Sequence, residues 1–499
     1  MADGFPRSIY DPDTGPPQRP AACVVLRRGD GSLLLVRRGD TLSFMPGHHV
    51  FPGGRVDPED ALVPVDNAPD PEDARHIAAA ARELFEEAGV LPAACAPPPP
   101  GQLRRMRADL TAGRLGFAAM LAQLGARIDA AQFRPAGRWI TPVFMPVRYD
   151  TRHYLVEDRG WPRDPTPPDP GGETAAADWM TPGEALRRWR AGRVKMATPT
   201  AFTLRSMDRL PPEDALARML RVPGTDDAAA FMEPRAGIVI MPLRTETLPP
   251  ATHTNCAVVG WDDLCVVDPG PSDPEERARL VARLDDFVAL GGRVAAVALS
   301  HGHRDHADAA RLIRDRYGAA VWAHPAAALP DGLRADRLMA DGEAVELGGD
   351  PPWRLRALHT PGHDPGHLCF FEEGGSTLFC GDLFANPGTI VVSPEHGGDM
   401  TAYLASLERV AAVDAGMIVP GHGMNMTGPV ARERLLWLIR HRMERERRIL
   451  EAWEAGARTV AELTARAYAD TPGAPARLAG MQVRAHLARL GLTPEDGAL

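Results

Sequence analysis

His301-Gly302-His303-Arg304-Asp305-His306 places three imidazoles and one carboxylate within six residues, directly after the apolar run Val294–Leu299. The apolar run predicts a buried strand, so the polar side chains begin where that strand ends. This spacing lets His301 and His303 reach one metal ion. Asp305 and His306 would reach a second ion a few ångströms away. Imidazole and carboxylate ligands without a thiolate are typical of a catalytic zinc site with an open position.

Three further candidate ligands follow along the chain, each beside a turn or at the end of an apolar segment. His363 lies in the stretch His359-Thr-Pro-Gly-His363-Asp-Pro-Gly-His367, whose prolines and glycines predict a tight turn. Asp382 ends the short apolar segment that leads into Phe379-Cys-Gly-Asp382, and a carboxylate there could bridge two cations. His422 follows Ile418-Val-Pro-Gly, again a strand that runs into a turn.

The order of these motifs resembles that of the metallo-β-lactamase superfamily, over roughly residues 236–430. The resemblance implies an αββα sandwich with two Zn²⁺ ions along one edge of its sheets. It also implies a ligand set, in which His301, His303 and His363 bind one ion, Asp305, His306 and His422 bind the other, and Asp382 bridges them. Asp268, in Val266-Val-Asp268-Pro-Gly270, matches an early strand-end motif of the family and would orient a ligand. A simple turn carboxylate is the alternative for Asp268.

The predicted ligands indicate the class of reaction. Two cations a few ångströms apart lower the pKa of a shared water, so that hydroxide is present near neutral pH, and they take up developing negative charge. Asp305 would also orient the nucleophile. For His367, four residues after His363, we expect a role as proton donor or substrate contact, with turn stabilisation as the alternative. The reaction is hydrolysis of an ester, thioester, lactam or phosphodiester, and the ligands do not choose among these.

The first 230 residues form a separate unit. Ala22–Leu26 and Ser32–Val36 predict a β-hairpin, and a helix is expected from Ala74 to Gly89. Glu83, Glu86 and Glu87 fall at positions i, i+3 and i+4 of that helix, so their carboxylates share one face. Like charges so placed repel each other unless a cation holds them.

Arg82-Glu83-Leu-Phe-Glu86-Glu87-Ala-Gly89-Val90 resembles the second half of the Nudix box. The first half is stretched, with Gly53-Gly54 upstream and either Glu59 or Asp60 in place of the usual glutamate. Together with Phe44-Met-Pro-Gly and Phe51-Pro-Gly-Gly, this is similar to the acyl-CoA diphosphatase branch of the family. The resemblance implies that Glu86 and Glu87 bind Mg²⁺ or Mn²⁺, that Glu83 is a ligand or base, and that Arg82 holds the loop. A catalytically inactive ligand-binding Nudix module is the alternative.

After His422 the sequence predicts a long arginine-rich helix over about Pro429–Ala455, then two short helices over Thr459–Ala467 and Met481–Leu490. Helix, short helix, loop, helix and a small wing are the outline of a winged helix. The combination with His441-Arg-x-x-Arg-Glu-x-x-Ile-Leu450 resembles the β-lactamase-like protein 2 group, which contains single-strand-specific endoribonucleases. The arginines would guide RNA, or alternatively cover the solvent side of the helix and pair with Glu433, Glu444 and Glu446.

Composition sets wider limits on the protein. Its 499 residues and 44% apolar content indicate two to three globular domains, and its net charge of −10 argues against general coating of nucleic acid. No apolar run is long enough for a membrane span, no secretory signal is visible, and the six scattered cysteines fit reduced thiols in a cytoplasmic protein. The expected fold is a multidomain α/β and α+β chain: a flexible N-terminus over 1–20, a Nudix αβα sandwich over 21–215, a linker over 216–235, the αββα sandwich over 236–430 and the winged helix over 431–499.

Two hypotheses for function follow. In the first, the dinuclear zinc site hydrolyses phosphodiesters of single-stranded RNA, which the basic tail guides. In the second, the substrates are small molecules: the Nudix half cleaves a CoA-type or nucleotide pyrophosphate, and the zinc half cleaves a thioester or another ester. Neither hypothesis involves a membrane, and the sequence does not indicate an oligomeric state.

Overall fold

The computed structural model describes residues 15–143, 145–169, 171–221, 231–330, 332–471 and 473–495. The chain divides into two compact units, with the division between Ala236 and Gly237. The segment 216–235, predicted as a linker, contains the end of helix α6 (Pro212–Leu220) and strand β11 (Met232–Arg235), so part of it is regular structure. Residues 222–230 of that segment, and most of the predicted flexible N-terminus, lie outside the described residues.

The N-terminal unit, residues 15–236, is built on a mixed sheet with the strand order β10-β3-β2-β1-β8-β7, to which β4 and β9 are added beside β1 and β2. The strands are β1 (Gln18–Arg27), β2 (Leu33–Arg38), β3 (His48–Val50), β4 (Gly53–Arg55), β7 (Arg134–Ile140), β8 (Arg148–Glu157), β9 (Thr174–Met180) and β10 (Lys195–Met196), with a separate pair β5 (Val65–Asp66) and β6 (Ile128–Asp129). The helices besides α6 are α1 (Pro71–Ala88), α2 (Gln102–Thr111), α3 (Phe117–Leu124), α4 (Pro182–Arg190) and α5 (Thr198–Arg209), with short 3₁₀ turns η2 (Pro58–Leu62) and η3 (Ala130–Gln132).

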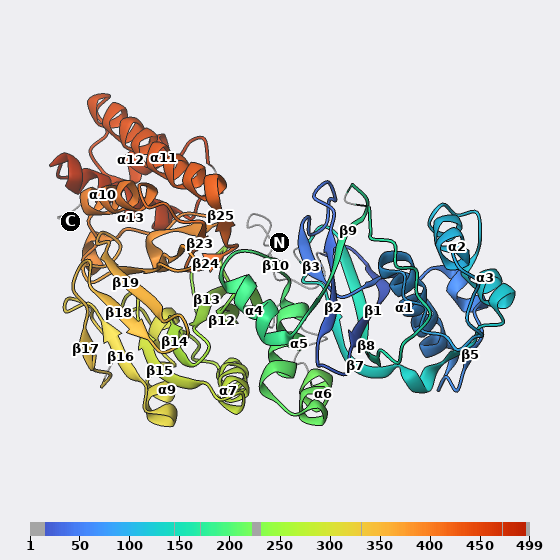
Figure 1. The fold of residues 1–499 in the computed structure, drawn as a ribbon. Coiled ribbons are helices and arrows are strands. Elements are labelled where there is room, and N and C mark those ends of the chain that lie inside the picture. The colour runs from blue at the N-terminus through green and yellow to red at the C-terminus, as the bar shows by residue number, and fades with distance from the viewer. Residues whose placement is uncertain are drawn as a thin grey trace. The chain divides into compact units, whose positions relative to one another are not determined.

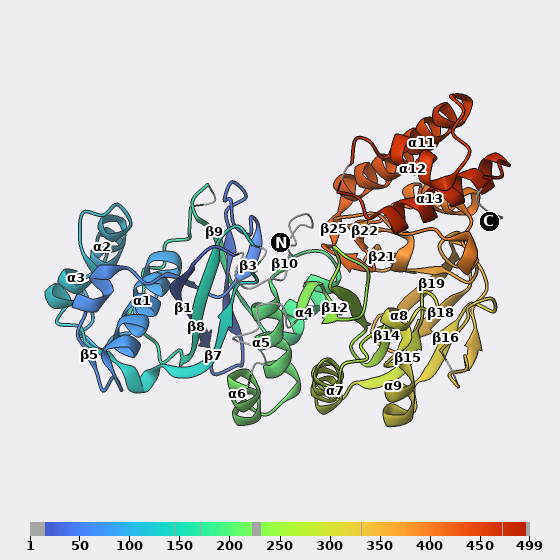
Figure 2. The same ribbon diagram turned by 180° about the vertical axis from the view of Figure 1, so that it is seen from behind.

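Helix α1 carries the predicted glutamates and is fixed at both ends. The Asp70 side chain accepts a hydrogen bond from the backbone N–H of Asp73, and Pro71 occupies the first turn, so the helix begins three residues before the predicted start. Gly89 ends it with a φ of 70°. Leu84 and Phe85 share a core with alternate residues of β1. Figures 1 and 2 place α1 and α5 on opposite sides of the sheet, the αβα arrangement expected from the sequence.

The C-terminal unit, residues 237–495, contains two facing sheets. The first comprises β12 (Ile238–Arg244), β13 (His253–Val259), β14 (Asp263–Val267), β15 (Arg293–Ala298), β16 (Ala320–Ala323) and β17 (Arg337–Leu338), paired in that order. The second comprises β18 (Ala344–Leu347), β19 (Trp353–His359), β20 (Leu368–Glu372), β21 (Thr377–Phe379), β23 (Met417–Val419) and β25 (Met426–Thr427), also in order. A small pair, β22 (Ala385–Asn386) and β24 (His422–Gly423), stands apart from both.

One apolar core lies between these sheets, because inward-facing residues of both belong to a single buried cluster, among them Ile240, Ala296, Leu355 and Phe370. Helices α7 (Pro274–Ala289) and α9 (Ala310–Tyr317) pack on β15 of the first sheet. Helix α10 (Met400–Ala411) packs on the second sheet together with the first turns of α11 (Gly428–Glu454). The result is the expected αββα sandwich, with helices outside both sheets (Figure 1).

Three helices end the chain: α11, α12 (Val460–Ala467) and α13 (Ala476–Leu490). The boundary predicted at residue 430 falls inside α11, whose Leu435 and Leu438 are buried in the core of the second sheet. No strand follows α13 up to Glu495, where the described part of the chain stops, so the structure does not confirm the predicted winged helix. None of the described helices has the length and apolar character needed to cross a lipid bilayer.

Candidate metal centre

The predicted metal ligands all follow strands that end at the same edge of the sandwich. The 301–306 segment begins three residues after the last residue of β15, and its second half lies in the one-turn helix α8 (Arg304–Ala307). His363 follows β19, Asp382 lies in the 3₁₀ turn η4 (Gly381–Leu383) after β21, and His422 follows β23. Because β21 and β23 run parallel, their carboxyl ends meet at one edge and bring distant segments together.

Three imidazole nitrogens form the first group. His301 Nε2 lies 2.9 Å from His303 Nδ1, and His363 Nε2 lies 3.0 Å from the same His303 atom. Burial, followed by the neighbouring imidazoles, lowers the pKa of His301 well below its ordinary value, and burial also lowers the pKa of His303. The lowered pKa values favour neutral rings, and the ligand atoms of His301, His303 and His363 lie close enough together to bind one ion.

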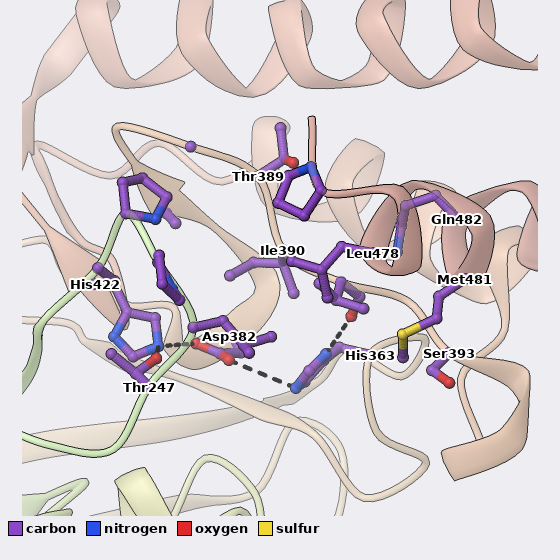
Figure 3. A pocket seen from close by; sticks show the side chains of 18 of the residues that line it. Thr247, His363, Asp382, Thr389, Ile390, Ser393, His422, Leu478, Met481 and Gln482 are labelled. Atoms are coloured by element: carbon purple, nitrogen blue, oxygen red, sulfur yellow. Dashed lines mark hydrogen bonds and ion pairs between the residues drawn. The ribbon is translucent and has the colours of Figure 1, made fainter. Parts of the chain in front are cut away.

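The second group joins two imidazoles to carboxylates. Asp382 Oδ1 lies 3.2 Å from His306 Nε2 and 3.1 Å from His422 Nε2, and Asp305 Oδ2 lies 3.6 Å from the same His422 atom. The other oxygen of Asp382, Oδ2, faces the first group, 3.5 Å from His363 Nε2. In Figure 3 Asp382 lies between His422 and His363 and is joined to each. One carboxylate therefore reaches both groups.

The donor set fits a pair of divalent cations. All seven predicted ligands fall into two convergent groups, His301, His303, His363 and Asp382, and Asp305, His306 and His422. His306 Nε2 and Asp382 Oδ1 are buried and have no hydrogen-bond partner within the described residues. Burial opposes protonation of His306, yet Asp382, Asp305 and Asp268 together raise its pKa, so the surroundings favour a positive charge there. An ion would supply that charge and occupy the unpartnered atoms.

The ring nitrogens that face away from the centre are held by hydrogen bonds. Asp268 Oδ2 lies 3.0 Å from His306 Nδ1, and its Oδ1 accepts the Ser300 N–H at 2.7 Å. His363 Nδ1 lies 2.7 Å from the Val391 carbonyl oxygen, and His422 Nδ1 lies 2.9 Å from the His253 carbonyl oxygen. Such partners fix the ring orientation of ligands. Asp268 therefore lies where the resemblance predicts a residue that orients a ligand.

A close backbone approach supports the same segment. A Cβ atom added to Gly270 would lie 1.6 Å from the carbonyl oxygen of Asp305 and 3.0 Å from the backbone nitrogen of His306. Only glycine allows the strand-end turn after β14 to approach the ligand-bearing turn this closely.

His367 lies elsewhere than expected. Its side chain is fully buried, its Nδ1 lies 2.9 Å from the Thr360 hydroxyl, and burial lowers its pKa to about 3. It is absent from the residues that line the pocket described below. The enclosed ring lies 5.3 Å from that of His301 between centroids, so this conformation does not support a role as proton donor or substrate contact, and the bond with Thr360 fits the alternative of turn stabilisation.

A pocket of about 530 Å³ opens onto the candidate centre and reaches helices α11 and α13. Much of its wall is apolar, including Leu248, Pro250, Ile390, Leu478 and Met481. Figure 3 shows Leu478, Met481 and Gln482 of α13 on the side opposite His422. Thr247, from the loop between β12 and β13, contributes a hydroxyl 3.3 Å from His422 Nε2.

In the N-terminal unit, Arg82 organises the glutamate face of α1. Its Nε and Nη2 donate to the two oxygens of Asp60 at 2.9 and 3.0 Å, and its Nη1 donates to Glu83 and Glu86 at 2.8 and 3.1 Å. Asp60 is 2% exposed, whereas Glu59 points to solvent. Asp60 is therefore the residue of the stretched first half of the box that meets Arg82.

The carboxylates of Glu83, Glu86 and Glu87 do not form a convergent group of metal ligands in the described residues. Glu87 instead accepts the Gly53 N–H at 2.9 Å and the Thr174 hydroxyl at 3.1 Å. Within the described residues, the convergent groups of potential metal ligands are the two of the centre above. Burial raises the pKa of Glu83 to about 8 and that of Glu87 to about 7. A cation at this face would have to draw the carboxylates together.

Sequence reasoning missed several residues of these sites. Thr247 precedes its strand in a loop without a motif, and Arg442 of the pocket is one arginine among many on α11. The choice between Glu59 and Asp60 had no local signal either, because both lie in the same turn. The hydroxyl of Thr174 comes from β9, far along the chain from Glu87.

Comparison with known families agrees with the interpretation of both motifs, the ligand cluster at 301–306 and the glutamate helix at 82–90. Residues 249–422 match the model of the metallo-beta-lactamase superfamily, and residues 17–100 match that of the NUDIX domain. The chain carries a metallo-β-lactamase domain and a Nudix domain. It is an enzyme of the hydrolase class. The NUDIX description names no branch, so the likeness of this Nudix domain to acyl-CoA diphosphatases stays a prediction.

Relatives of the metallo-β-lactamase domain differ in their named activities. A hydroxyacylglutathione hydrolase, GloC, of Haemophilus influenzae is 29% identical over 200 residues, 36% of this chain and 89% of that protein. The thioesterase pkgB of Emericella nidulans is 29% identical over 39% of this chain and 53% of its own length. A beta-lactamase-like protein 2 homolog of Caenorhabditis elegans is 32% identical over 30% of this chain and 48% of its own length. The chain thus spans about half of the last two relatives.

Proposed function

We propose that the metallo-β-lactamase domain is a dinuclear zinc hydrolase of small-molecule thioesters. The position of Asp382 supports binding of two ions, because its two oxygens face the two groups of imidazoles. His301, His303 and His363 would hold one ion, Asp305, His306 and His422 the other, and Asp382 both. Imidazole and carboxylate donors without thiolate favour zinc in a catalytic site.

When bound, two such cations would lower the pKa of a water molecule and polarise the carbonyl under attack. The residues of the chain supply the rest. Asp305 and Asp382 place carboxylate oxygens at the pocket end, where they can accept a proton and orient a water. The hydroxyl of Thr247 adjoins His422 and can donate a hydrogen bond to an oxygen bound in the pocket. Asp268 and the Val391 carbonyl hold the rings of His306 and His363 in place.

The pocket supports a small acyl substrate better than a nucleic acid. A largely apolar cavity of about 530 Å³ has the size and lining typical of small-molecule sites. Two of the relatives described above are named for hydrolysis of hydroxyacylglutathione and of thioesters. These names do not support RNA, which the sequence alone favoured. The expected winged helix is also without its wing in the described residues.

Hydrolysis of short-chain acyl thioesters by the zinc-loaded full chain should release free thiol, measured by a colorimetric thiol assay, while single-stranded RNA stays intact. His303→Ala should lose this activity, because a ligand of the first group is removed. Arg304→Ala, at the neighbouring exposed position, should keep it. Cleavage of RNA without thiol release, lost in His303→Ala, would reject the thioesterase in favour of a phosphodiesterase.

A second candidate function belongs to the Nudix domain: Mg²⁺- or Mn²⁺-dependent hydrolysis of a CoA-type or nucleotide pyrophosphate. The pairing of Arg82 with buried Asp60 favours it, because this pair, with the bond from Arg82 to the Arg55 carbonyl oxygen, holds the segment after Gly54 against the glutamate face. A Cβ at Gly54 would lie 2.3 Å from a Glu83 oxygen, so the glycines keep that face open. Binding without turnover would instead indicate a ligand-binding module.

Mg²⁺ affinity of the Nudix domain should rise with pH. Because burial raises the pKa of Glu83 to about 8 and of Glu87 to about 7, both carboxyls hold protons that a cation must displace. Binding should therefore be weak near about pH 6 and complete above about pH 9, with protons released between them. Without metal, the free energy of unfolding should instead fall as the pH rises. A carboxyl whose pKa is raised in the folded protein stabilises the fold while it is protonated, and this contribution is lost as the pH rises.

Isothermal titration calorimetry of the full chain with Mg²⁺ in several buffers would measure affinity and proton release together. Glu87→Gln should flatten the pH dependence, and Glu59→Gln, at the exposed neighbour of Asp60, should leave it unchanged. An affinity that does not vary with pH would contradict the role of these carboxyls.

A further inference from the structure

A buried guanidinium without a carboxylate partner lines the pocket of the metallo-β-lactamase domain. Arg442, on α11, is 2% exposed. Its Nη1 donates to Gln482 Oε1 at 2.6 Å, its Nη2 donates to the Ile390 carbonyl oxygen, and its Nε has no partner within the described residues. Both of its hydrogen-bond acceptors are neutral. The ring of Tyr403 lies 5.5 Å from the guanidinium carbon, and of the five N–H donors of the guanidinium the one at Nε is left for a ligand.

Two neighbouring arginines are matched by acids, whereas Arg434, earlier on α11, donates to the Gly388 carbonyl oxygen and, like Arg442, has no partner at its Nε within the described residues. Arg445, also buried in the pocket wall, pairs with Asp470 at 2.9 Å. Arg489 pairs with Glu446. Arg442 forms no such ion pair with a described residue, although burying a charge without a counter-charge is costly. The missing negative charge therefore points to a ligand.

The surroundings of Arg442 are electropositive. His441 also lines the pocket, and burial, followed by Arg442 and Arg445, lowers its pKa to about 4. The ring is thus neutral at physiological pH and can donate or accept a hydrogen bond without adding charge. The positive charge at this end of the pocket therefore comes from the guanidinium of Arg442, and the neutral ring of His441 can add a hydrogen bond.

The guanidinium and the candidate metal centre share a wall. The Ile390 carbonyl accepts from Arg442, and the carbonyl of the next residue, Val391, accepts from the ligand His363. Since Cα atoms of consecutive residues lie about 3.8 Å apart, the two ends of the pocket are joined through a single short segment. Gln482 also donates to the carbonyl of Val392, at 3.2 Å.

We propose that Arg442 binds a carboxylate or phosphate group carried by the substrate, while the apolar lining holds the segment between that group and the scissile bond. The substrate class becomes an anionic acyl thioester, with the charge on either the thiol half or the acyl half. This inference rests on the proposed thioesterase function for its kinetic test, and on binding alone for its second test.

The kinetic test compares three short-chain acyl thioesters on the zinc-loaded full chain. One is neutral (acetyl-N-acetylcysteamine), one carries a phosphate on the thiol half (acetyl-4′-phosphopantetheine), and one carries a carboxylate on the acyl half (succinyl-N-acetylcysteamine). One of the two anionic substrates should exceed the neutral one in kcat/KM. Arg442→Met should reduce that ratio by about 10- to 100-fold, or about 1.4 to 2.8 kcal/mol. The anionic substrate whose kcat/KM advantage falls in Arg442→Met shows whether the natural charge lies on the thiol half or on the acyl half.

The matched control is Arg440→Met, which removes an exposed arginine two residues away on the same helix and should keep the ratio. If Arg442 only holds the Ile390 segment in place, Arg442→Met should lower kcat/KM for all three substrates equally. An unchanged ratio would therefore overturn the proposal. Should Arg442→Met not fold, Leu478→Glu places a carboxylate in the pocket wall without removing the bonds of Arg442. It should reduce the same ratio, and an unchanged ratio there would also count against the anion site.

Binding tests the anion site separately from hydrolysis. n-Butyl phosphate should raise the thermal midpoint of the wild-type protein and of Arg440→Met, and raise it less in Arg442→Met, while n-butanol has no effect. Equal shifts in wild type and Arg442→Met would reject the site. If no thioester is cleaved but the shift depends on Arg442, the proposed function fails and the anion site stands.

Discussion

Replacing Asp382 with asparagine should remove most of the hydrolytic activity and one of the two metal ions. The two oxygens of Asp382 face both ligand groups, and an amide nitrogen cannot replace a carboxylate oxygen as a ligand. We expect kcat/KM to fall on the order of 10²- to 10³-fold, the size seen when one group that stabilises developing charge is lost. Metal content by mass spectrometry should drop from two ions per chain to one or fewer.

The fold itself should survive Asp382→Asn, because the side chain lies at the sheet edge and outside the core between the sheets. Asp315→Asn, an exposed carboxylate on α9, is the matched control and should keep both ions and the wild-type rate. A variant at Asp382 that retains two ions and normal turnover would show that the carboxylate does not bridge them.

Gly270→Ala should destabilise the metallo-β-lactamase domain and weaken its metal binding together. The added Cβ would overlap the Asp305 carbonyl oxygen at 1.6 Å, and backbone atoms cannot rotate away as a side chain can. We expect a loss of about 3 kcal/mol or more in the free energy of unfolding, at the upper end for a single substitution. Urea denaturation with and without zinc would measure both effects, because bound metal stabilises the folded domain and raises the urea concentration at which it unfolds.

Gly473→Ala, in the same unit, is the control for this substitution. Nothing lies within 4 Å of the Cβ it would add, so its effect should stay within about 0.5 kcal/mol. Equal stability of the two variants would mean that the turn after β14 can move away from the ligand segment at little cost.

Local pattern was enough to select the candidate ligands because each marker is short-range. The strand Val294–Leu299 and the cluster after it are neighbours in sequence, and the Pro-Gly turns at His363 and His422 need only a few residues to form. The stop of α1 at Gly89 and the position of its glutamates follow from helix geometry alone. The convergence of these segments follows from parallel strands that end at one edge.

Two predictions did not find support in the structure. His367 stands four residues after His363 and looked equally able to reach the cleft, but the turn directs it behind His301. The three C-terminal helices suggested a wing, but no strand follows α13 in the described residues, and the first turns of α11 pack into the core of the sandwich. Neither outcome could be predicted from residue spacing or composition.

Side-chain identity and short-range spacing by themselves determined which residues form the candidate centre, the two domain types and the hydrolytic chemistry, because ligand preference is a property of the individual imidazole or carboxylate. Only the tertiary structure decided that Asp60 and not Glu59 meets Arg82, that Asp382 lies between two groups, and that Arg442 is buried beside neutral partners. These depend on contacts between segments far apart in the chain. Such contacts are settled by the packing of the whole domain, which no local pattern contains.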